Sequence, residues 1–164
     1  MSVVFMDGEF ASLHPNGIDL LSLALIKENG EELYLELECK AEISPWVSLN
    51  VIPHLTEEKV SLEEAKEKIR EFIGDEKPVL VAYVNQFDWM GLCRLFGANS
   101  PEEMSELPFH RIPVDFASIL FAKNKQVVSL VAAARKYDIK VSGVQHHALH
   151  DARLLKAVYE KVME

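Results

Sequence analysis

The sequence predicts an α/β protein in which helices flank a mixed sheet. Three observations support this fold class. Strand patterns in the first quarter of the chain predict a three-stranded antiparallel meander, and a continuous apolar run at 79–84 is typical of a strand buried on both faces. Helical spacing recurs between and after these strands. With 164 residues the chain is long enough to bury a core of its own, so residues 1–164 are expected to form a single domain.

The meander is expected to begin with a strand at 2–7, where a short apolar run meets the first acidic residue. The run 18–26 is also strand-like, and Asn29-Gly30 after it predicts a type I′ hairpin turn. From 33 to 38, leucines alternate with tyrosine and glutamates. This period of two predicts a half-exposed third strand.

The middle of the chain is expected to contain a short helix within 44–55. Ser61 and Glu64 then have the spacing of a capping box, apolar residues follow at helical spacing, and Gly74 is expected to end this second helix. After the buried strand at 79–84, residues 85–88 are expected to open another helix, which runs over 89–96 and is closed by Gly97.

The remaining elements are short. Residues 99–106 are the most loop-like part of the chain, and 112–114 predict a short strand. Two short helices are expected at 116–122 and 127–137. A final helix is expected after the histidines near position 150.

Charge and composition argue against a protein that binds long duplexes, spans a membrane or depends on disulfides. The net charge of -9 disfavours a protein that grips long stretches of duplex, because such binding depends on cations that neutralise many phosphates. The N-terminus lacks a basic leader and a long apolar run, so no signal peptide or membrane span is expected. Cys39 and Cys93 lie outside disulfide or zinc motifs. A cytoplasmic protein is therefore expected.

Four acidic residues are the candidate metal ligands. Asp7 and Glu9 follow the first strand, and two residues that are two apart on a strand point to the same side. Asp88 follows the buried strand, and functional residues gather at the carboxyl ends of strands in open sheets. Asp151 lies near the start of the last helix. Oxygen ligands favour Mg²⁺ or Mn²⁺ over zinc, so a carboxylate site for two divalent cations is expected.

Three histidines, His146, His147 and His150, accompany Asp151. A structural zinc site built from them is disfavoured because no cysteine lies nearby in the sequence. The alternative is that one of them acts as a general base.

The order of these motifs resembles the DEDDh 3′–5′ exonuclease superfamily, which has a ribonuclease H-like fold. The matching motifs are Asp-x-Glu after the first strand, Phe-Asp at the start of a helix, and His-x-Ala-x-x-Asp-Ala entering the last helix. Within the superfamily, segments 44–55, 82–88 and 92–97 look most like the bacterial ribonuclease AS group. The resemblance covers nearly the whole chain.

The resemblance implies roles for individual residues. Asp7 would bridge two cations, Glu9 and Asp151 would complete the ligands of the first, and Asp88 would hold the second. His146, five residues before Asp151, would be the general base. These roles imply hydrolysis of the last phosphodiester of single-stranded RNA to a nucleoside 5′-monophosphate. The resemblance also implies a homodimer.

Departures from the pattern leave alternatives open. His147 occupies the place where a sister subclass has tyrosine, so it is the second candidate for the base. Asn85 stands three residues before Asp88 instead of four and is assigned no role. The same acidic residues would serve a DNA exonuclease equally well, because none of them reports on a 2′-hydroxyl. A non-catalytic nucleic-acid-binding module of this fold is disfavoured because no carboxylate is missing.

Phe10, Leu13 and Trp46 are candidate contacts to the terminal base, since aromatic and apolar faces accept any base. Core packing is the alternative for each of them.

Asp115 and Asp138 are expected to be surface or capping residues.

Overall fold

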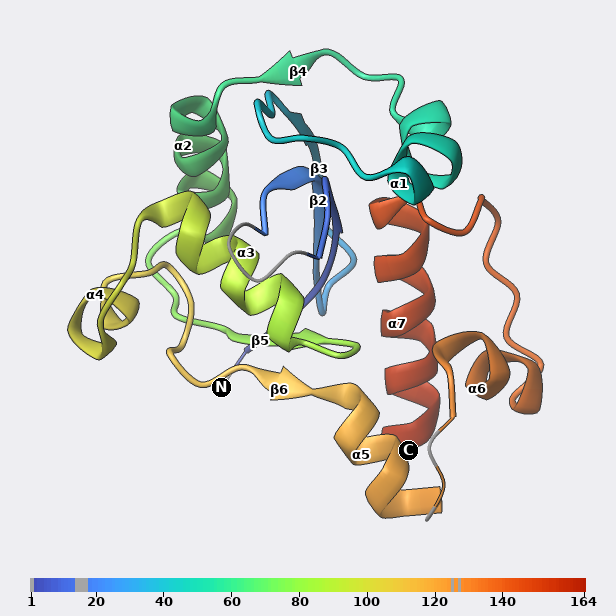
Figure 1. Ribbon diagram of the computed structural model, residues 1–164. Helices are drawn as coiled ribbons and strands as arrows, with labels where there is room; N and C mark the ends of the chain where they lie inside the picture. Colours follow the sequence, from blue (N-terminus) through green and yellow to red (C-terminus); the bar gives the residue numbers. More distant parts are fainter. Residues whose placement is uncertain (1, 14–17, 125, 127) are drawn as a thin grey trace.

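A computed structural model describes residues 2–13, 18–124, 126 and 128–164. Its centre is a six-stranded sheet in the order β4-β3-β2-β1-β5-β6 (Figure 1). The strands are β1 (Val3–Phe10), β2 (Leu20–Lys27), β3 (Glu32–Leu37), β4 (Lys59–Val60), β5 (Val79–Ala82) and β6 (Val114–Asp115). Strands β1, β2 and β3 pair antiparallel, and the other pairs are parallel. The predicted mixed sheet with its antiparallel meander is confirmed.

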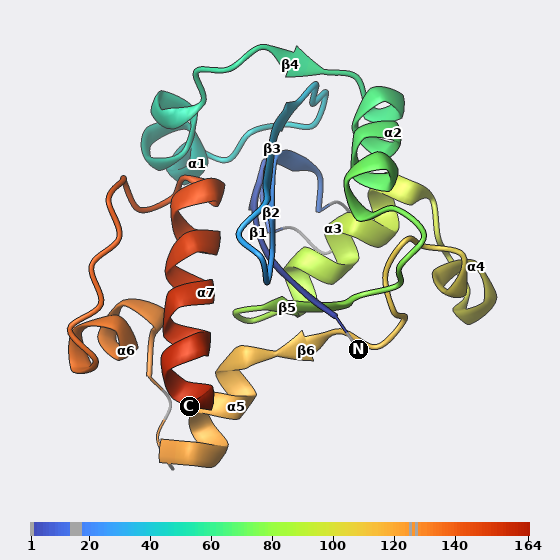
Figure 2. The same ribbon diagram turned by 180° about the vertical axis from the view of Figure 1, so that it is seen from behind.

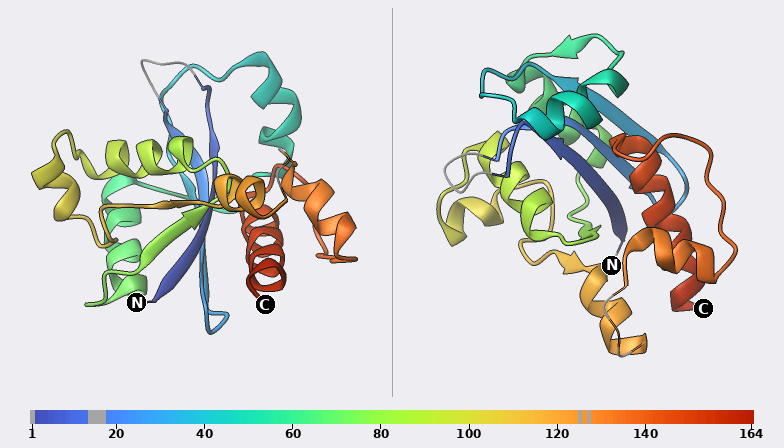
Figure 3. Two further views of the ribbon diagram at one scale, coloured as in Figure 1. Left: turned by 90° about the horizontal axis from the view of Figure 1, so that it is seen from below. Right: turned by 45° about the vertical axis from the view of Figure 1, so that its right-hand side comes forward.

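Helices cover both faces of this sheet. They are α1 (Pro45–Asn50), the 3₁₀ helix η1 (Ile52–His54), α2 (Leu62–Ile73), α3 (Gln86–Phe96), α4 (Pro101–Ser105), α5 (Phe116–Asn124), α6 (Leu130–Lys136) and α7 (Ala148–Met163). Helices α2 and α3 lie on one face and α7 on the other (Figures 1 and 2). The view from below in Figure 3 shows α3 and α7 on opposite sides of the strands. None of the described helices is long and apolar enough to cross a membrane.

The alternation of side chains along β1 decides which face receives the acidic residues. Val4 and Met6 pack into the core beneath α2 and α3, whereas Phe5 packs into the core beneath α7. Because side chains alternate along a strand, Asp7 and Glu9 follow Phe5 toward α7. Strand β1 runs to residue 10, further than the predicted end at residue 7, so both carboxylates belong to one strand, whose pairing with β2 shifts register directly after Glu9.

The hairpin between β2 and β3 differs from the predicted type I′ turn. A type I′ turn needs positive φ at both central residues, but Gly30 has φ 92° and Asn29 is not among the residues with positive φ. Gly30 N–H donates to Lys27 O at 3.0 Å, and Lys27 N–H donates to Glu31 O at 2.9 Å. The loop therefore has three residues, with glycine at its left-handed position.

The segment predicted as a loop at 99–106 contains a helix, α4. The Ser100 side chain accepts from Glu103 N–H, and the Glu103 side chain accepts from Ser100 N–H in return. This reciprocal pair satisfies amides that the helix start would otherwise leave unpaired. Pro101 occupies the first helical position, where its missing N–H costs nothing.

Other boundaries moved by a few residues. Ser61 caps α2 by accepting from Glu64 N–H, but the predicted capping box forms only in part, since the Glu64 carboxylate pairs with Lys68. Gly74 and Gly97 end their helices. Strand β5 stops at Ala82, before Val84 with its φ of 60°. Position 127, the predicted start of the sixth α-helix, lies outside the described residues.

Candidate active site

One pocket of about 620 Å³ brings together the candidate residues. It lies between the end of β1, helix α1, the start of α3 and the N-terminal end of α7. Its lining includes every predicted metal ligand, the predicted base and the predicted substrate contacts: Asp7, Glu9, Phe10, Leu13, Trp46, Asp88, His146 and Asp151. These positions come from four separate segments of the chain, so the fold assembles the site.

Gly8 allows β1 and α3 to approach closely at the acidic residues. A Cβ at this position would lie 2.9 Å from Leu20 Cδ2 and 3.4 Å from Asp88 Oδ1. Asp88 is in the first turn of α3 and is 5% exposed. Its carboxylate thus reaches the edge of β1 from the α3 side, while Asp7 and Glu9 point toward α7.

Asp151 and His146 approach from the start of α7. Asp151 Oδ2 accepts from His146 N–H at 2.9 Å, and His146 has φ 65°, in the left-handed region. One ligand atom each from Glu9, His146 and Asp151 lies within 4.8 Å of the other two. This spacing lets the three side chains share a cation.

Crowding and burial raise the pKa values of these carboxyl groups. Burial is the main cause for Asp7, followed by repulsion from Asp88, Asp151 and Glu9. Burial and the charge of Asp151 raise the pKa of Glu9 to about 8. Burial also raises the pKa of Asp88, although backbone hydrogen bonds from Gly8 and from its own amide oppose the shift. Buried carboxylates that lie this close together are stabilised by protonation or by bound cations. Their oxygens are the ligand atoms that hard divalent ions prefer.

The three histidines have different environments. The His147 ring stacks on Tyr34 with the ring centroids 4.7 Å apart. His150 Nδ1 lies 3.2 Å from Ser142 O, and its Nε2 lies 3.8 Å from Asp151 Oδ1. Of the three, His146 is the one grouped with Glu9 and Asp151.

The pocket wall beyond the acidic residues is aromatic and apolar. Leu13 is 58% exposed and Trp46 is 54% exposed, and the Trp46 ring contacts the His146 ring edge-on at 5.0 Å. Phe10 is 9% exposed and packs tightly, since a Cβ at Gly91 would lie 2.8 Å from Phe10 Cε1. Phe10 therefore belongs to the core as well as to the pocket wall.

Asp115 supports the site in a way that the sequence did not reveal. Its Oδ1 accepts from Val84 N–H at 2.9 Å and from Asn85 N–H at 3.4 Å, which holds the turn leading into α3. Its Oδ2 accepts from Ser118 N–H at 3.0 Å, the capping role that was predicted. Burial alone would raise the pKa of Asp115, but the hydrogen bonds from Ser118, Asn85 and Ala117 lower it overall.

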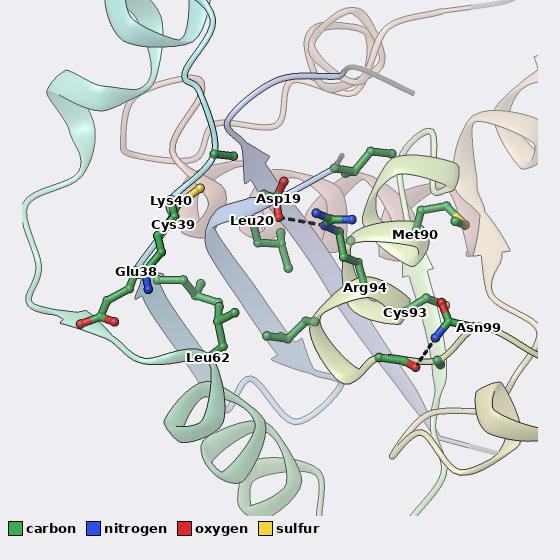
Figure 4. Close-up of a pocket in the computed structure, with 17 residues that line it drawn as sticks. Asp19, Leu20, Glu38, Cys39, Lys40, Leu62, Met90, Cys93, Arg94 and Asn99 are labelled. Carbon is green, nitrogen blue, oxygen red and sulfur yellow. Dashed lines mark hydrogen bonds and ion pairs between the residues drawn. The ribbon is translucent and has the colours of Figure 1, made fainter. Parts of the chain in front are cut away.

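A larger cavity of about 820 Å³ lies on the α2 and α3 side of the sheet (Figure 4). Asp19 and Arg94 form an ion pair of 2.8 Å there, and Asn99 Nδ2 donates to Gly97 O at 2.8 Å. Its charged Arg94 is thus already paired. None of the four predicted metal ligands lines this cavity, so the smaller pocket is the candidate active site.

Several solved structures share this fold at low sequence identity. The chain aligns with S. pombe Pop2p in its Mg²⁺ and Mn²⁺ bound form with a TM-score of 0.76 and 14% identity, covering 98% of this chain and 82% of that one. It aligns with E. coli exonuclease I in complex with a dT13 oligonucleotide with a TM-score of 0.77 and 14% identity, covering 98% of this chain. The chain spans 40% of the length of exonuclease I.

A third structure is the nuclease domain of 3′hExo, described as a DEDDh family member bound to rAMP. It aligns with a TM-score of 0.72 and 13% identity, covering 99% of this chain and 91% of that one. The fold is thus the ribonuclease H-like fold of DEDDh exonucleases, as predicted. Comparison with curated proteins yields no match.

A family model matches residues 3–163, which is nearly the whole chain. The matched segment contains all four carboxylates and His146, and the fold agrees with that of the solved exonucleases. The chain therefore belongs to the family of 3′-5′ exoribonuclease Rv2179c-like domains and is a DEDDh-type 3′–5′ exonuclease domain.

Proposed function

We propose that this protein is a metal-dependent 3′–5′ exoribonuclease that removes nucleoside 5′-monophosphates from single-stranded RNA. The observation that carries the proposal is the convergence of four carboxylates and His146 on one pocket. The family match and the rAMP bound to 3′hExo support a ribonucleotide as the substrate unit.

Two divalent cations, Mg²⁺ or Mn²⁺, fit this donor set. Asp7 would be shared by both, Glu9 and Asp151 would complete the first site, and Asp88 would hold the second. The raised pKa values of the buried carboxyl groups support this assignment, because cations would offset their mutual repulsion. When bound, such ions neutralise phosphate charge and favour deprotonation of an attacking water.

His146 is the proposed general base. Its imidazole takes a proton from the water that attacks the last phosphodiester, the bond from phosphorus to the 3′-oxygen breaks, and that oxygen acquires a proton. The products are a nucleoside 5′-monophosphate and an RNA that is one nucleotide shorter. The grouping of His146 with Glu9 and Asp151 supports this role. Measuring cation affinity in a His146 variant distinguishes a base, whose loss leaves the affinity intact, from a ligand, whose loss lowers it.

The terminal nucleotide is proposed to bind against Phe10, Leu13 and Trp46. Leu13 and Trp46 are largely exposed at the pocket, which leaves their apolar surfaces available to a base. The net charge of -9 supports a short footprint, because few phosphates can be neutralised along the surface.

We further propose that residues 1–164 are a single exonuclease domain that acts as a homodimer in the cytoplasm. The family match over 3–163 supports the single domain. The free thiols of Cys39 and Cys93 fit a reducing compartment. Sedimentation equilibrium of the purified chain tests the dimer.

A 3′–5′ DNA exonuclease is the second candidate, because exonuclease I shares the fold and was solved with a DNA oligonucleotide. Matched 5′-labelled RNA and DNA oligomers distinguish the two. The proposal expects a descending ladder on RNA with 5′-monophosphates as the other product, and slower cleavage of DNA. Faster digestion of DNA would favour the second candidate, and internal cuts in a circular RNA would contradict both. Asp88→Asn is the inactive control.

A further inference from the structure

Strand β3 presents two side chains toward α7 that the proposed mechanism does not use. Tyr34 and Glu36 alternate with leucines that face the other layer. Tyr34 OH donates to Glu36 Oε1 at 3.0 Å, and the Tyr34 ring stacks on the His147 ring with an interplanar angle of 24°. This contact joins the sheet to the residue that immediately follows the proposed base.

Glu36 makes Tyr34 a rigid support. The side chain of Glu36 is buried, at 1% exposed, and its Oε1 also accepts from Thr56 N–H at 2.8 Å and Glu57 N–H at 3.1 Å. Burying a carboxylate is costly unless hydrogen bonds compensate. Here the hydroxyl and two amides satisfy Oε1, while Oε2 is buried without a hydrogen-bond partner among the described residues. The tyrosine hydroxyl is therefore held by a fixed group on the same strand.

The turn at His146 needs such a support. A non-glycine residue with φ of 65° is strained and persists only when its surroundings hold it. His147 begins α7 without a side-chain capping hydrogen bond. The Asp151 carboxylate holds the turn through His146 N–H, but this carboxylate is also a proposed cation ligand. The ring contacts from Tyr34 and Trp46 also support this turn, and neither ring belongs to a proposed cation ligand.

We infer that Tyr34 is a positioning residue of the active site: by stacking on His147 it holds the left-handed turn that presents the His146 imidazole to Glu9 and Asp151. The inference rests on the proposed function, in which His146 is the general base. Tyr34 does not line the pocket, so it acts through His146 and not through the substrate.

A double-mutant cycle tests this inference. Tyr34→Leu should lower kcat roughly twofold to tenfold, the effect of one aromatic pair, and leave KM and the affinity for Mn²⁺ unchanged. In a His146→Ala background, Tyr34→Leu should cause no further loss, because the group that it positions is absent. Tyr34→Phe keeps the ring and should restore most of the activity.

Tyr137→Leu is the matched control, since Tyr137 is a half-buried tyrosine next to α6 outside the pocket, and its kcat should equal that of the wild type. Should Tyr34→Leu not fold, His147→Ala removes the same stack from the helix side and should show the same loss and the same dependence on His146. Equal losses in both backgrounds, or a loss confined to KM, would overturn the inference. An unimpaired His146→Ala enzyme would instead overturn the base assignment in the proposed function.

Discussion

Replacing Glu9 by glutamine should stabilise the metal-free protein while abolishing its activity. Glu9 is buried beside Asp151, and both effects raise its pKa from 4.5 to about 8. Glutamine has nearly the same shape as the protonated side chain but cannot ionise. The substitution therefore removes the cost of a buried charge and, with it, a proposed cation ligand.

The magnitude follows from linkage between protonation and folding. Because the pKa of Glu9 is higher in the folded state, the folded protein binds more protons than the unfolded chain between pH 4.5 and about 8, and its stability falls as the pH rises through that window. Each pKa unit corresponds to about 1.4 kcal/mol, so Glu9 costs the fold less than about 1 kcal/mol at pH 5, about 3 kcal/mol at pH 7 and nearly 5 kcal/mol at pH 9.

Urea denaturation in EDTA at pH 5, 7 and 9 measures this cost. The free energy of unfolding of Glu9→Gln should match that of the wild type at pH 5 and exceed it by several kcal/mol at pH 9. Glu42→Gln removes an exposed glutamate and serves as the control. Saturating Mn²⁺ should stabilise the wild type more than Glu9→Gln. A stability difference that is independent of pH, or a Glu9→Gln protein that is no more stable at pH 9, would refute the reasoning.

Three further predictions follow from the same site. Activity should vanish in EDTA and return with Mg²⁺ or Mn²⁺ but not with Ca²⁺, whereas hydrolysis by a metal-free preparation would end the cation-dependent mechanism. His146→Ala should lower kcat by about 10² to 10⁴ with cation affinity intact by calorimetry, and a larger loss in His147→Ala would transfer the base assignment. The KM for an RNA oligomer should depend weakly on salt, so that a plot of log KM against the logarithm of the salt concentration has a slope below about 2. A steeper slope would indicate contacts with more phosphates.

The sequence predicted the acidic site because its information is local. Asp7 and Glu9 are two apart on a strand, and Asp88 and Asp151 lie in the first turns of helices. Both element types can be read from apolar periodicity. The family resemblance carried by the order of the motifs then implied that Asp88 and Asp151 join the carboxylates of β1. No distant contact had to be deduced from residue types alone.

The supporting contacts could not be predicted in the same way. Asp115 lies 31 residues from Val84 in the sequence and accepts a hydrogen bond from its amide. The Tyr34 ring on the sheet stacks on His147 at the start of α7. Such contacts depend on strand order and register, which leave no short motif in the sequence. Asp115 does have a local signature, the hydrogen bond to Ser118 at the start of α5, and this explains why only its capping role was predicted.

Two of the errors in secondary structure, at the hairpin and at α4, have local causes. Asn29-Gly30 favours a two-residue turn by statistics, but the pairing of β2 with β3 sets the loop at three residues. Helix α4 has five residues and lacks apolar periodicity, so its cap at Ser100 and Pro101 was outweighed by the polar composition around it.

The contact between Gly91 and Phe10 matters to anyone who wants a more heat-resistant version of this enzyme. Gly91 lies inside α3, where exchanging glycine for alanine ordinarily raises helix stability by about 1 kcal/mol, so a design guided by helix propensity would select this substitution early. The added methyl group would push against the Phe10 ring, which forms part of the pocket wall. Engineering at this position therefore sets a gain in helix propensity against the shape of the wall that is proposed to receive the terminal nucleotide.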